Sequence, residues 1–134
     1  MLADVFVLLL AAHWAADYPG QTDHQARHKS EHSALGWRAN LAHAVTHVVL
    51  SVVLLGIGAL LTDEVTLMPS ATAFALGWVG ISHGFIDRGW PGDRWMSFAR
   101  QSGFKAHGGA AHVDQAAHVL LGLLPAALLL ATIG

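Results

Sequence analysis

Four apolar segments of this chain each carry one pair of ionisable side chains spaced four residues apart. The segments are residues 2–16, 41–61, 71–86 and 116–133. The pairs lie within or just beside them and are, in chain order, His13 with Asp17, His43 with His47, His83 with Asp87, and Asp114 with His118. Residues four apart lie on one face of an α-helix. Because ionisable groups are costly in an apolar setting, each pair is expected to face a neighbouring helix.

The composition favours a membrane protein over a soluble one. Hydrophobic residues make up 54% of the chain and charged residues 12%, about half the 25% that is usual in soluble domains. The second and fourth segments approach the roughly 20 residues that cross a bilayer, and the first and third reach that length only with their polar ends. A soluble four-helix bundle is the alternative, but it needs polar outer faces that the second and fourth segments lack.

The basic residues predict the orientation in the membrane. All seven Lys and Arg residues fall in two connections, residues 18–39 and 88–109, whereas the connection around residues 62–69 holds Asp63 and Glu64. Because basic loops remain in the cytoplasm, both chain ends are predicted to be extracytoplasmic. Residues 1–16 have no basic stretch before their apolar run, so a retained helix is expected rather than a signal peptide.

The spacing of the pairs indicates an internal duplication. His13 and His83 are 70 residues apart, as are Asp17 and Asp87, and the pair at 43 and 47 recurs 71 residues later at 114 and 118. The chain is therefore predicted to be a single membrane domain, residues 1–134, built from two helical hairpins, residues 1–61 and 70–134.

The position of each pair within its helix predicts one common site. The pair lies near the C-terminal end of the first and third segments and near the N-terminal end of the second and fourth. Alternate helices of an up-down-up-down bundle run in opposite directions. All four pairs should therefore meet at the cytoplasmic end of an all-α, four-helix transmembrane bundle.

Imidazole and carboxylate groups that converge inside a bundle are typical of a metal site. The candidate ligands are His13, Asp17, His43, His47, His83, Asp87, Asp114 and His118. Eight candidates exceed the three or four protein ligands of one zinc ion. They favour two metal ions, or one ion whose histidines are oriented by carboxylates. Zinc is the preferred metal, with iron and manganese as alternatives; the chain has no cysteine to supply a thiolate.

A metal-dependent hydrolase is the leading functional prediction. A bound metal lowers the pKa of its water to about 7, and an aspartate among Asp17, Asp87 and Asp114 is expected to act as the general base. The alternatives are a transporter or channel for a metal ion or proton, and a structural protein held together by His–Asp hydrogen bonds. Residues 48–61 and 119–133 offer only Ser51 as a polar side chain before Thr132, which counts against a transporter within one chain. Haem bound by two histidines would leave the aspartates unexplained.

The connections carry further polar residues. His24, His28 and His32 are spaced to share one face of a surface helix, which predicts a helix on the lipid headgroups or a second metal or anion site. Trp37, Trp90 and Trp95 are expected to anchor the interface. The basic residues Arg88, Arg94, Arg100 and Lys105 are expected to bind lipid phosphates or an anionic substrate. Gln21 and Gln115 are candidate hydrogen-bond donors to the site, and Asn40 is a candidate N-cap.

Expected partners are membrane lipids, an anionic or lipid substrate and further copies of the chain. A net charge of −2 gives no sign of nucleic-acid binding.

The stretch "HWAADYPGQTD" resembles the opening motif of the small bacterial and phage membrane proteins grouped as DUF3307. "HAVTH", "HGFID" and "DQAAH" are similar to the remaining motifs of that family, in the same order, whereas Pro19 and Gly20 depart from its pattern. The resemblance covers nearly the whole chain and implies a multi-pass protein of the bacterial cytoplasmic membrane, of unknown function. A looser similarity to membrane-bound metal-dependent hydrolases implies zinc-type hydrolysis by analogy.

Overall fold

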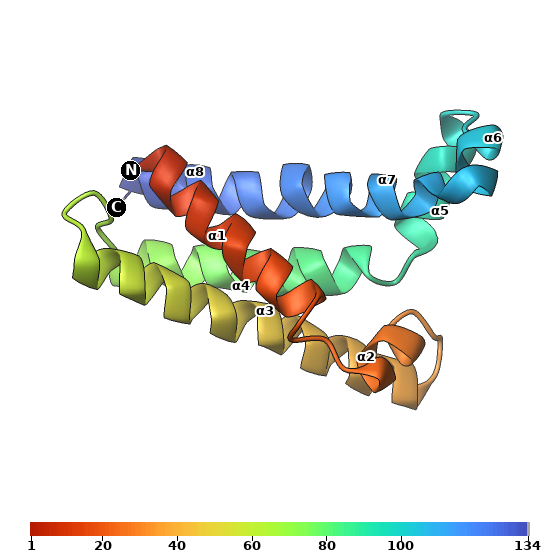
Figure 1. Ribbon diagram of the computed structural model, residues 1–134, viewed down its shortest axis with the longest axis horizontal. Helices are drawn as coiled ribbons and strands as arrows, with labels where there is room; N and C mark the ends of the chain where they lie inside the picture. The colour runs from red at the N-terminus through yellow and green to blue at the C-terminus, as the bar shows by residue number, and fades with distance from the viewer. Residues whose placement is uncertain (134) are drawn as a thin grey trace.

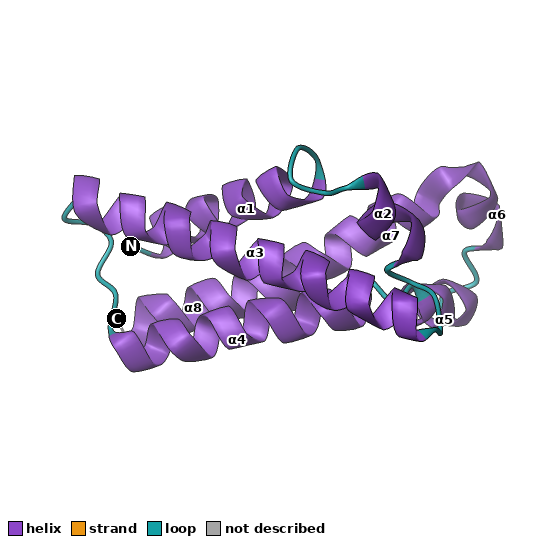
Figure 2. Cartoon of the chain, turned by 90° about the horizontal axis from the view of Figure 1, so that it is seen from below, coloured by secondary structure: helices purple, strands orange, loops and turns teal. Residues whose placement is uncertain are grey.

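The body of the molecule consists of four helical rods that pack along one another, Leu2–Asp17, Ala34–Leu61, Pro69–Ile86 and, as the last rod, Ser102–Ile133. Figure 1 shows how they are arranged. The computed structural model describes residues 1–133. The elements are α1 (Leu2–Asp17), α2 (Asp23–His28), α3 (Ala34–Leu61), α4 (Pro69–Ile86), α5 (Trp90–Phe98), α6 (Ser102–Phe104), η1 (Lys105–Gly109), α7 (Ala110–Ala117), η2 (His118–Leu123) and α8 (Leu124–Ile133). Figure 2 shows helices and loops and no strand over that range, which confirms the all-α prediction.

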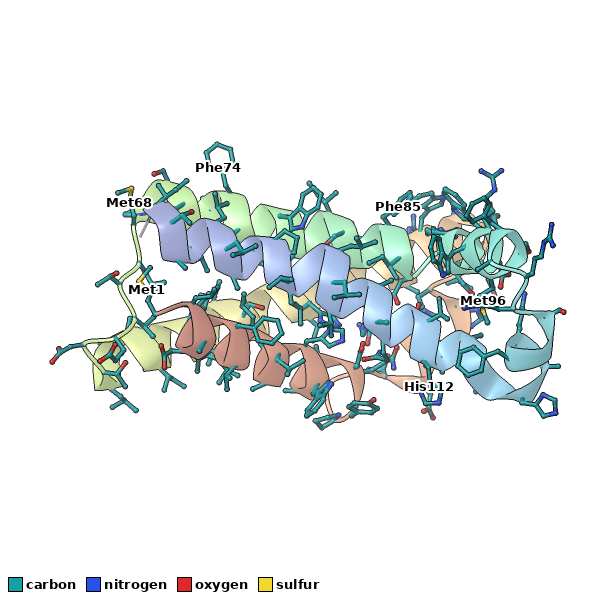
Figure 3. All side chains as sticks on the ribbon, turned by 90° about the horizontal axis from the view of Figure 1, so that it is seen from above. Met1, Met68, Phe74, Phe85, Met96 and His112 are labelled. Atoms are coloured by element: carbon teal, nitrogen blue, oxygen red, sulfur yellow. The ribbon has the colours of Figure 1, made fainter. Side chains whose placement is uncertain are left out.

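The chain runs back and forth along the bundle, so that both ends lie together (Figure 1). The short helices α2, α5 and α6 lie at the opposite end. Figure 3 shows the same division, with Met1 and Met68 at one end and Met96 and His112 at the other. Adjacent rods are therefore antiparallel, as the placement of the polar pairs requires.

Capping side chains set the start of the helices on the polar side of the bundle. Thr22 and Gln25 form a capping box at α2. Ser33 caps α3 by accepting a hydrogen bond from the Gly36 N–H. The prediction that Asn40 caps this helix is wrong, because Ser33 starts it earlier. Asn40 is instead buried, and its Nδ2 donates to the Gly84 carbonyl of α4.

An apolar core fills the half of the bundle nearest the chain ends. Its buried side chains include Val5, Leu9, Leu55, Val79, Leu123 and Leu130. The outer surface of the rods is also apolar. Val7, Leu41, Val49, Phe74, Ile81 and Leu120 are all exposed, and Phe74 points away from the bundle in Figure 3. Two helical runs, Ala34–Leu61 and Ser102–Ile133, are long and apolar enough to cross a membrane.

The last rod is irregular at two places. His107 and Gly108 are non-helical, and Gly108 has a φ of 87°. Farther on, η2 is a π-helical segment that begins at His118, and Pro125 follows it without an N–H to donate to the Leu121 carbonyl. The indole Nε1 of Trp78 on α4 donates to that oxygen at 2.9 Å, so this hydrogen bond ties α4 to the last rod.

We expect Trp78→Phe to lower the free energy of unfolding by about 1 kcal/mol, because the aromatic packing is kept and one hydrogen bond is lost. Denaturant unfolding monitored by circular dichroism measures the change. Trp14→Phe is the matched control, because Trp14 is similarly exposed and its indole has no hydrogen bond to residues 1–133. An equal loss in both variants would contradict the role of the hydrogen bond.

Candidate metal centre

Seven of the eight predicted ligands meet in one buried cluster at the polar end of the bundle. They are His13 and Asp17 of α1, His43 and His47 of α3, His83 and Asp87 at the end of α4, and His118 at the start of η2. Asp114 lies at the rim instead, with its side chain 38% exposed and Oδ2 3.4 Å from His118 Nδ1. The polar pairs therefore meet at one end of the bundle, as their positions in the sequence predicted.

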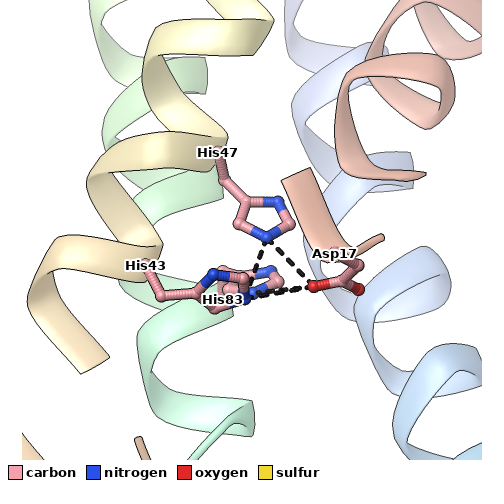
Figure 4. Close-up of side chains that lie close together, drawn as sticks. All are labelled: Asp17, His43, His47 and His83. Atoms are coloured by element: carbon pink, nitrogen blue, oxygen red, sulfur yellow. Dashed lines mark hydrogen bonds and ion pairs between the residues drawn. The ribbon is translucent and has the colours of Figure 1, made fainter. Parts of the chain in front are cut away.

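The Asp17 carboxylate faces His43, His47 and His83 (Figure 4). Its Oδ1 lies 3.1 Å from His43 Nε2 and 3.2 Å from His47 Nε2. The same oxygen lies 3.8 Å from His83 Nε2. The two Nε2 atoms of His43 and His47 are themselves 3.3 Å apart. One carboxylate oxygen therefore faces ring nitrogens from two other helices.

Hydrogen bonds alone do not account well for this convergence. If both Nε2 atoms of His43 and His47 carry hydrogens, two N–H groups crowd one oxygen and each other. If His47 Nε2 lacks its hydrogen, a lone pair faces a carboxylate, whereas a bare His43 Nε2 can accept a hydrogen bond from Lys29 Nζ at 3.2 Å. A cation among the three atoms resolves both conflicts. In a tetrahedral zinc site with ligand distances near 2.05 Å, ligand atoms are about 3.3 Å apart, which is close to the separations around Asp17.

A second group of ligand atoms adjoins the first. His83 Nε2 lies 3.1 Å from Asp87 Oδ2, and His118 Nε2 lies 3.8 Å from Asp87 Oδ1. Neither ring nitrogen, nor Asp87 Oδ2, makes a well-directed hydrogen bond within residues 1–133. The Nδ1 of His118 lies 3.0 Å from the Asp114 carbonyl. Donation there fixes the tautomer and leaves the Nε2 lone pair directed into the cluster.

The two groups share His83. The sets with ligand atoms close enough to hold a metal ion are Asp17, His43, His47 and His83, and His83, Asp87 and His118. A single Nε2 lone pair ligates one ion at a time, so the residues divide either as four around one ion or as three and three around two. In the second division each hairpin supplies two histidines and one aspartate. In that division His47 belongs to the first set and His83 to the second, and their rings are in contact, with centroids 3.4 Å apart.

His13 and Gln115 support the centre rather than complete it. His13 Nε2 lies 3.1 Å from Gln115 Oε1 and 3.3 Å from Asp17 Oδ2, and His13 belongs to neither set. Gln115 Nε2 donates to Asp17 Oδ2 at 3.0 Å, as predicted for a donor to the site. Gln21 donates to the Asp17 backbone carbonyl instead. His13 and Gln115 thus hold Oδ2 of the Asp17 carboxylate, so that Oδ1 faces His43, His47 and His83.

Sequence reasoning missed Lys29. This residue follows α2, and its Nζ lies 3.0 Å from Asp87 Oδ1 and 3.2 Å from His43 Nε2. The side chain is 19% exposed. Lys29 lies in a polar connection whose residues follow no apolar periodicity, so nothing in the pattern separates it from the solvated basic residues nearby.

Arg88 was expected to bind lipid phosphates or an anionic substrate, and the structure corrects this. Its guanidinium is buried, donates to the backbone carbonyls of Lys29 and Glu31, and lies 4.2 Å from the centroid of the Trp37 ring. Lys105 is paired with Asp93 at 2.6 Å. Arg88 therefore fastens the connection after α2 to the body of the bundle.

The three histidines of the first connection do not share one helix. The helix α2 ends at His28, so His32 lies outside it and that prediction is wrong. The capping box starts α2 at Asp23, and the chain turns after His28, where His28 Nδ1 lies 2.8 Å from Glu31 Oε1. The neighbouring His28 lowers the pKa of the Glu31 carboxyl from its usual value.

The fold and the cluster define an all-helical bundle protein with a buried His/Asp group that could hold a metal ion. A family model described as "Protein of unknown function (DUF3307)" matches residues 5–132. The chain belongs to the DUF3307 family, which confirms the resemblance. No curated protein and no solved structure matches the chain.

Proposed function

We propose that this chain is an integral membrane protein that binds two divalent metal ions and acts as a hydrolase. The observation that carries the proposal is the convergence of His43 Nε2 and His47 Nε2 on one oxygen of Asp17. Each hairpin then offers one set of two histidines and one aspartate. Three protein ligands with an open position are typical of catalytic zinc, which is our first choice; the same ligands also suit iron or manganese.

The outer surface supports insertion in the membrane. Large apolar side chains on α1, α3, α4 and the last rod are exposed, which would be unfavourable in water over so wide an area. At 1.5 Å per residue α1 is about 24 Å long and α4 about 27 Å. These lengths are close to the roughly 30 Å hydrocarbon core. The proposed orientation keeps the metal centre and the basic connections on the cytoplasmic side of the inner membrane.

The chain also offers a group for proton transfer. A bound metal would supply a water whose pKa is lowered to about 7. Asp17 and Asp87 face the ring nitrogens, whereas Asp114 lines a shallow pocket between α5 and α7 together with Gly89, Asp93 and Met96. Its Oδ2 lies close to His118. We assign Asp114 as the general base, because it is open to the pocket and adjoins the cluster.

Transport has less support than hydrolysis. Beyond the cluster the bundle is filled by the apolar core around Leu9, Leu55 and Leu130, so an ion leaving the centre along the bundle would meet no polar path through it. Ser51 and Ser82 are buried hydroxyl side chains of α3 and α4.

Metal content tests the proposal. Protein purified in mild detergent without added metal is expected to hold about two equivalents of zinc, iron or manganese by inductively coupled plasma mass spectrometry. His47→Ala and His118→Ala are each expected to lose at least one equivalent, because each removes one ligand of three from a set. His112→Ala is the matched control, since His112 is exposed on the last rod at the edge of the molecule (Figure 3).

A folded wild-type protein that holds no metal and takes none up on titration would contradict the proposal. The His/Asp cluster would then be an internal hydrogen-bonded network or a proton path. A loss of metal in His112→Ala equal to that in His47→Ala would place the bound metal elsewhere.

A further inference from the structure

The proposed metal centre has an excess of positive charge. Two divalent ions bring four positive charges, and the carboxylates Asp17 and Asp87 bring two negative ones. Lys29 adds one more positive charge beside Asp87. Even with Asp114 counted at the rim, two positive charges remain. Buried charge is unfavourable unless it is paired, so the loaded centre calls for an anionic partner.

Arg88 holds the backbone at Lys29 in place. Arg88 Nη1 donates to the Lys29 carbonyl at 2.9 Å, and Arg88 Nη2 donates to the Glu31 carbonyl. The guanidinium also stacks on Trp37, at the start of α3. Because one planar group fixes two carbonyls of the same segment, the backbone at Lys29 is anchored to two long helices. The ammonium group is therefore positioned over the cluster by the fold.

The position of the Lys29 ammonium group between the two proposed metal sets indicates what it could bind. Lys29 Nζ contacts one atom from each proposed metal set, His43 Nε2 and Asp87 Oδ1. The ammonium group therefore lies beside both sets. With His43 Nε2 bound to a metal ion, the ammonium group no longer shares that nitrogen, and an anion beside the two ions would take its place as the partner of Lys29. Lysine and metal ions together form the usual clamp on a transferring phosphoryl group.

We propose that Lys29 binds the phosphoryl group of the substrate, so that the substrate class is phosphate esters. This inference rests on the proposed function. A phosphate monoester has two negative charges, which match the excess of two, and a lysine binds phosphate as a compact point charge. In the reaction the water oxygen bonds to phosphorus while the ester P–O bond breaks. The water proton passes to Asp114 and then to the leaving alkoxide, giving inorganic phosphate and an alcohol.

Binding of inorganic phosphate tests the role of Lys29. Isothermal titration calorimetry on the metal-loaded protein in detergent is expected to give a phosphate affinity that falls about 10- to 100-fold in Lys29→Gln, the loss expected for one charge-assisted hydrogen bond. Arg27→Gln is the matched control, because it removes the same charge from an exposed position two residues away. If Lys29→Gln does not fold, Lys29→Met keeps the aliphatic length and serves as the second neutral variant.

Metal content measured on the same samples separates the two proposals. If the metal is retained and Lys29→Gln binds phosphate as tightly as the wild-type protein does, the inference about Lys29 is wrong and the metal centre stands. If the wild-type protein holds no metal, both fail. Hydrolysis of glycerol phosphate against that of phosphatidic acid in phosphatidylcholine vesicles then identifies the source of the phosphoryl group. Either activity, if weakened in Lys29→Gln and not in Arg27→Gln, supports the inference.

Discussion

Asp17→Asn is expected to lower the metal content from about two equivalents to about one. Asp17 Oδ1 is the atom on which His43, His47 and His83 converge. Asparagine keeps the shape but removes the negative charge, and its amide nitrogen cannot ligate a metal ion. Loss of a group that only orients a ligand already weakens metal binding 10- to 100-fold, so we expect loss of this direct ligand to weaken it at least about 100-fold.

Asp114→Asn is the matched control for this substitution. Both aspartates belong to the set predicted from the sequence, but Asp114 is at the rim and its side chain is well exposed. The Asp114→Asn protein is expected to keep nearly two equivalents of metal and to lose hydrolytic activity, because its carboxylate is assigned to proton transfer. Metal content measured beside circular dichroism distinguishes loss of metal from loss of the fold.

Two other results would change the assignment of the aspartates. If Asp114→Asn also loses metal, the ligand set is larger than the two groups around Asp17 and Asp87. If Asp17→Asn keeps both equivalents, the metal is bound elsewhere and Asp17 serves only to hold the histidines by hydrogen bonds.

The convergence of the polar pairs could be predicted because it depends only on their four-residue spacing and on their position within each apolar segment. A pair at i and i+4 marks one helix face, and alternate placement near opposite ends of successive segments brings the pairs to one level in an antiparallel bundle. These two facts suffice to bring His13, His43, His83 and His118 together. The internal duplication and the crossing of the membrane by all four rods stay predictions.

The sequence predicted less accurately which residue of the last rod faces the interior of the bundle. Period alone assigns Asp114 and His118 to one face, yet Gln115 is the residue that reaches Asp17. The rod packs on α5 at this level and becomes π-helical from His118. Rotation of the helix by about one residue turns Asp114 toward the pocket, and such a change depends on packing rather than on local sequence.

The roles of Lys29 and Arg88 depend on contacts between segments far apart in the chain. Arg88 lies 59 residues from the carbonyl of Lys29 to which it donates. Both residues belong to basic connections that follow no apolar period. The sequence counted Lys29 only among the basic residues that set the orientation, and it assigned Arg88 to lipid phosphates or an anionic substrate. Only the packing of the connection after α2 against the end of α4 brings Lys29 to the His/Asp cluster and buries Arg88.

Removal of metal by a chelator is expected to lower the unfolding temperature of the wild-type protein by about 10 °C. A ligand that binds only the folded state stabilises it by about 4 kcal/mol when its free concentration is a thousand times its Kd. For a chain of this size, each kcal/mol shifts the unfolding temperature by a few degrees. A bound cation would also separate the Asp17 carboxylate from the Nε2 atoms of His43 and His47, which lie 3.1 and 3.2 Å from it.

The Asp17→Asn protein provides the decisive comparison for this thermal shift. It lacks the metal ion of the Asp17 set from the start, so its unfolding temperature is expected to be lower than that of the wild-type protein and to fall less when the chelator is added. His112→Ala is expected to respond as the wild-type protein does. A cluster held by hydrogen bonds alone predicts the opposite for the wild-type protein: an unfolding temperature that is the same with and without chelator and falls only when an aspartate is replaced. The size of the chelator effect, more than the stability itself, therefore distinguishes a metal centre from a polar core.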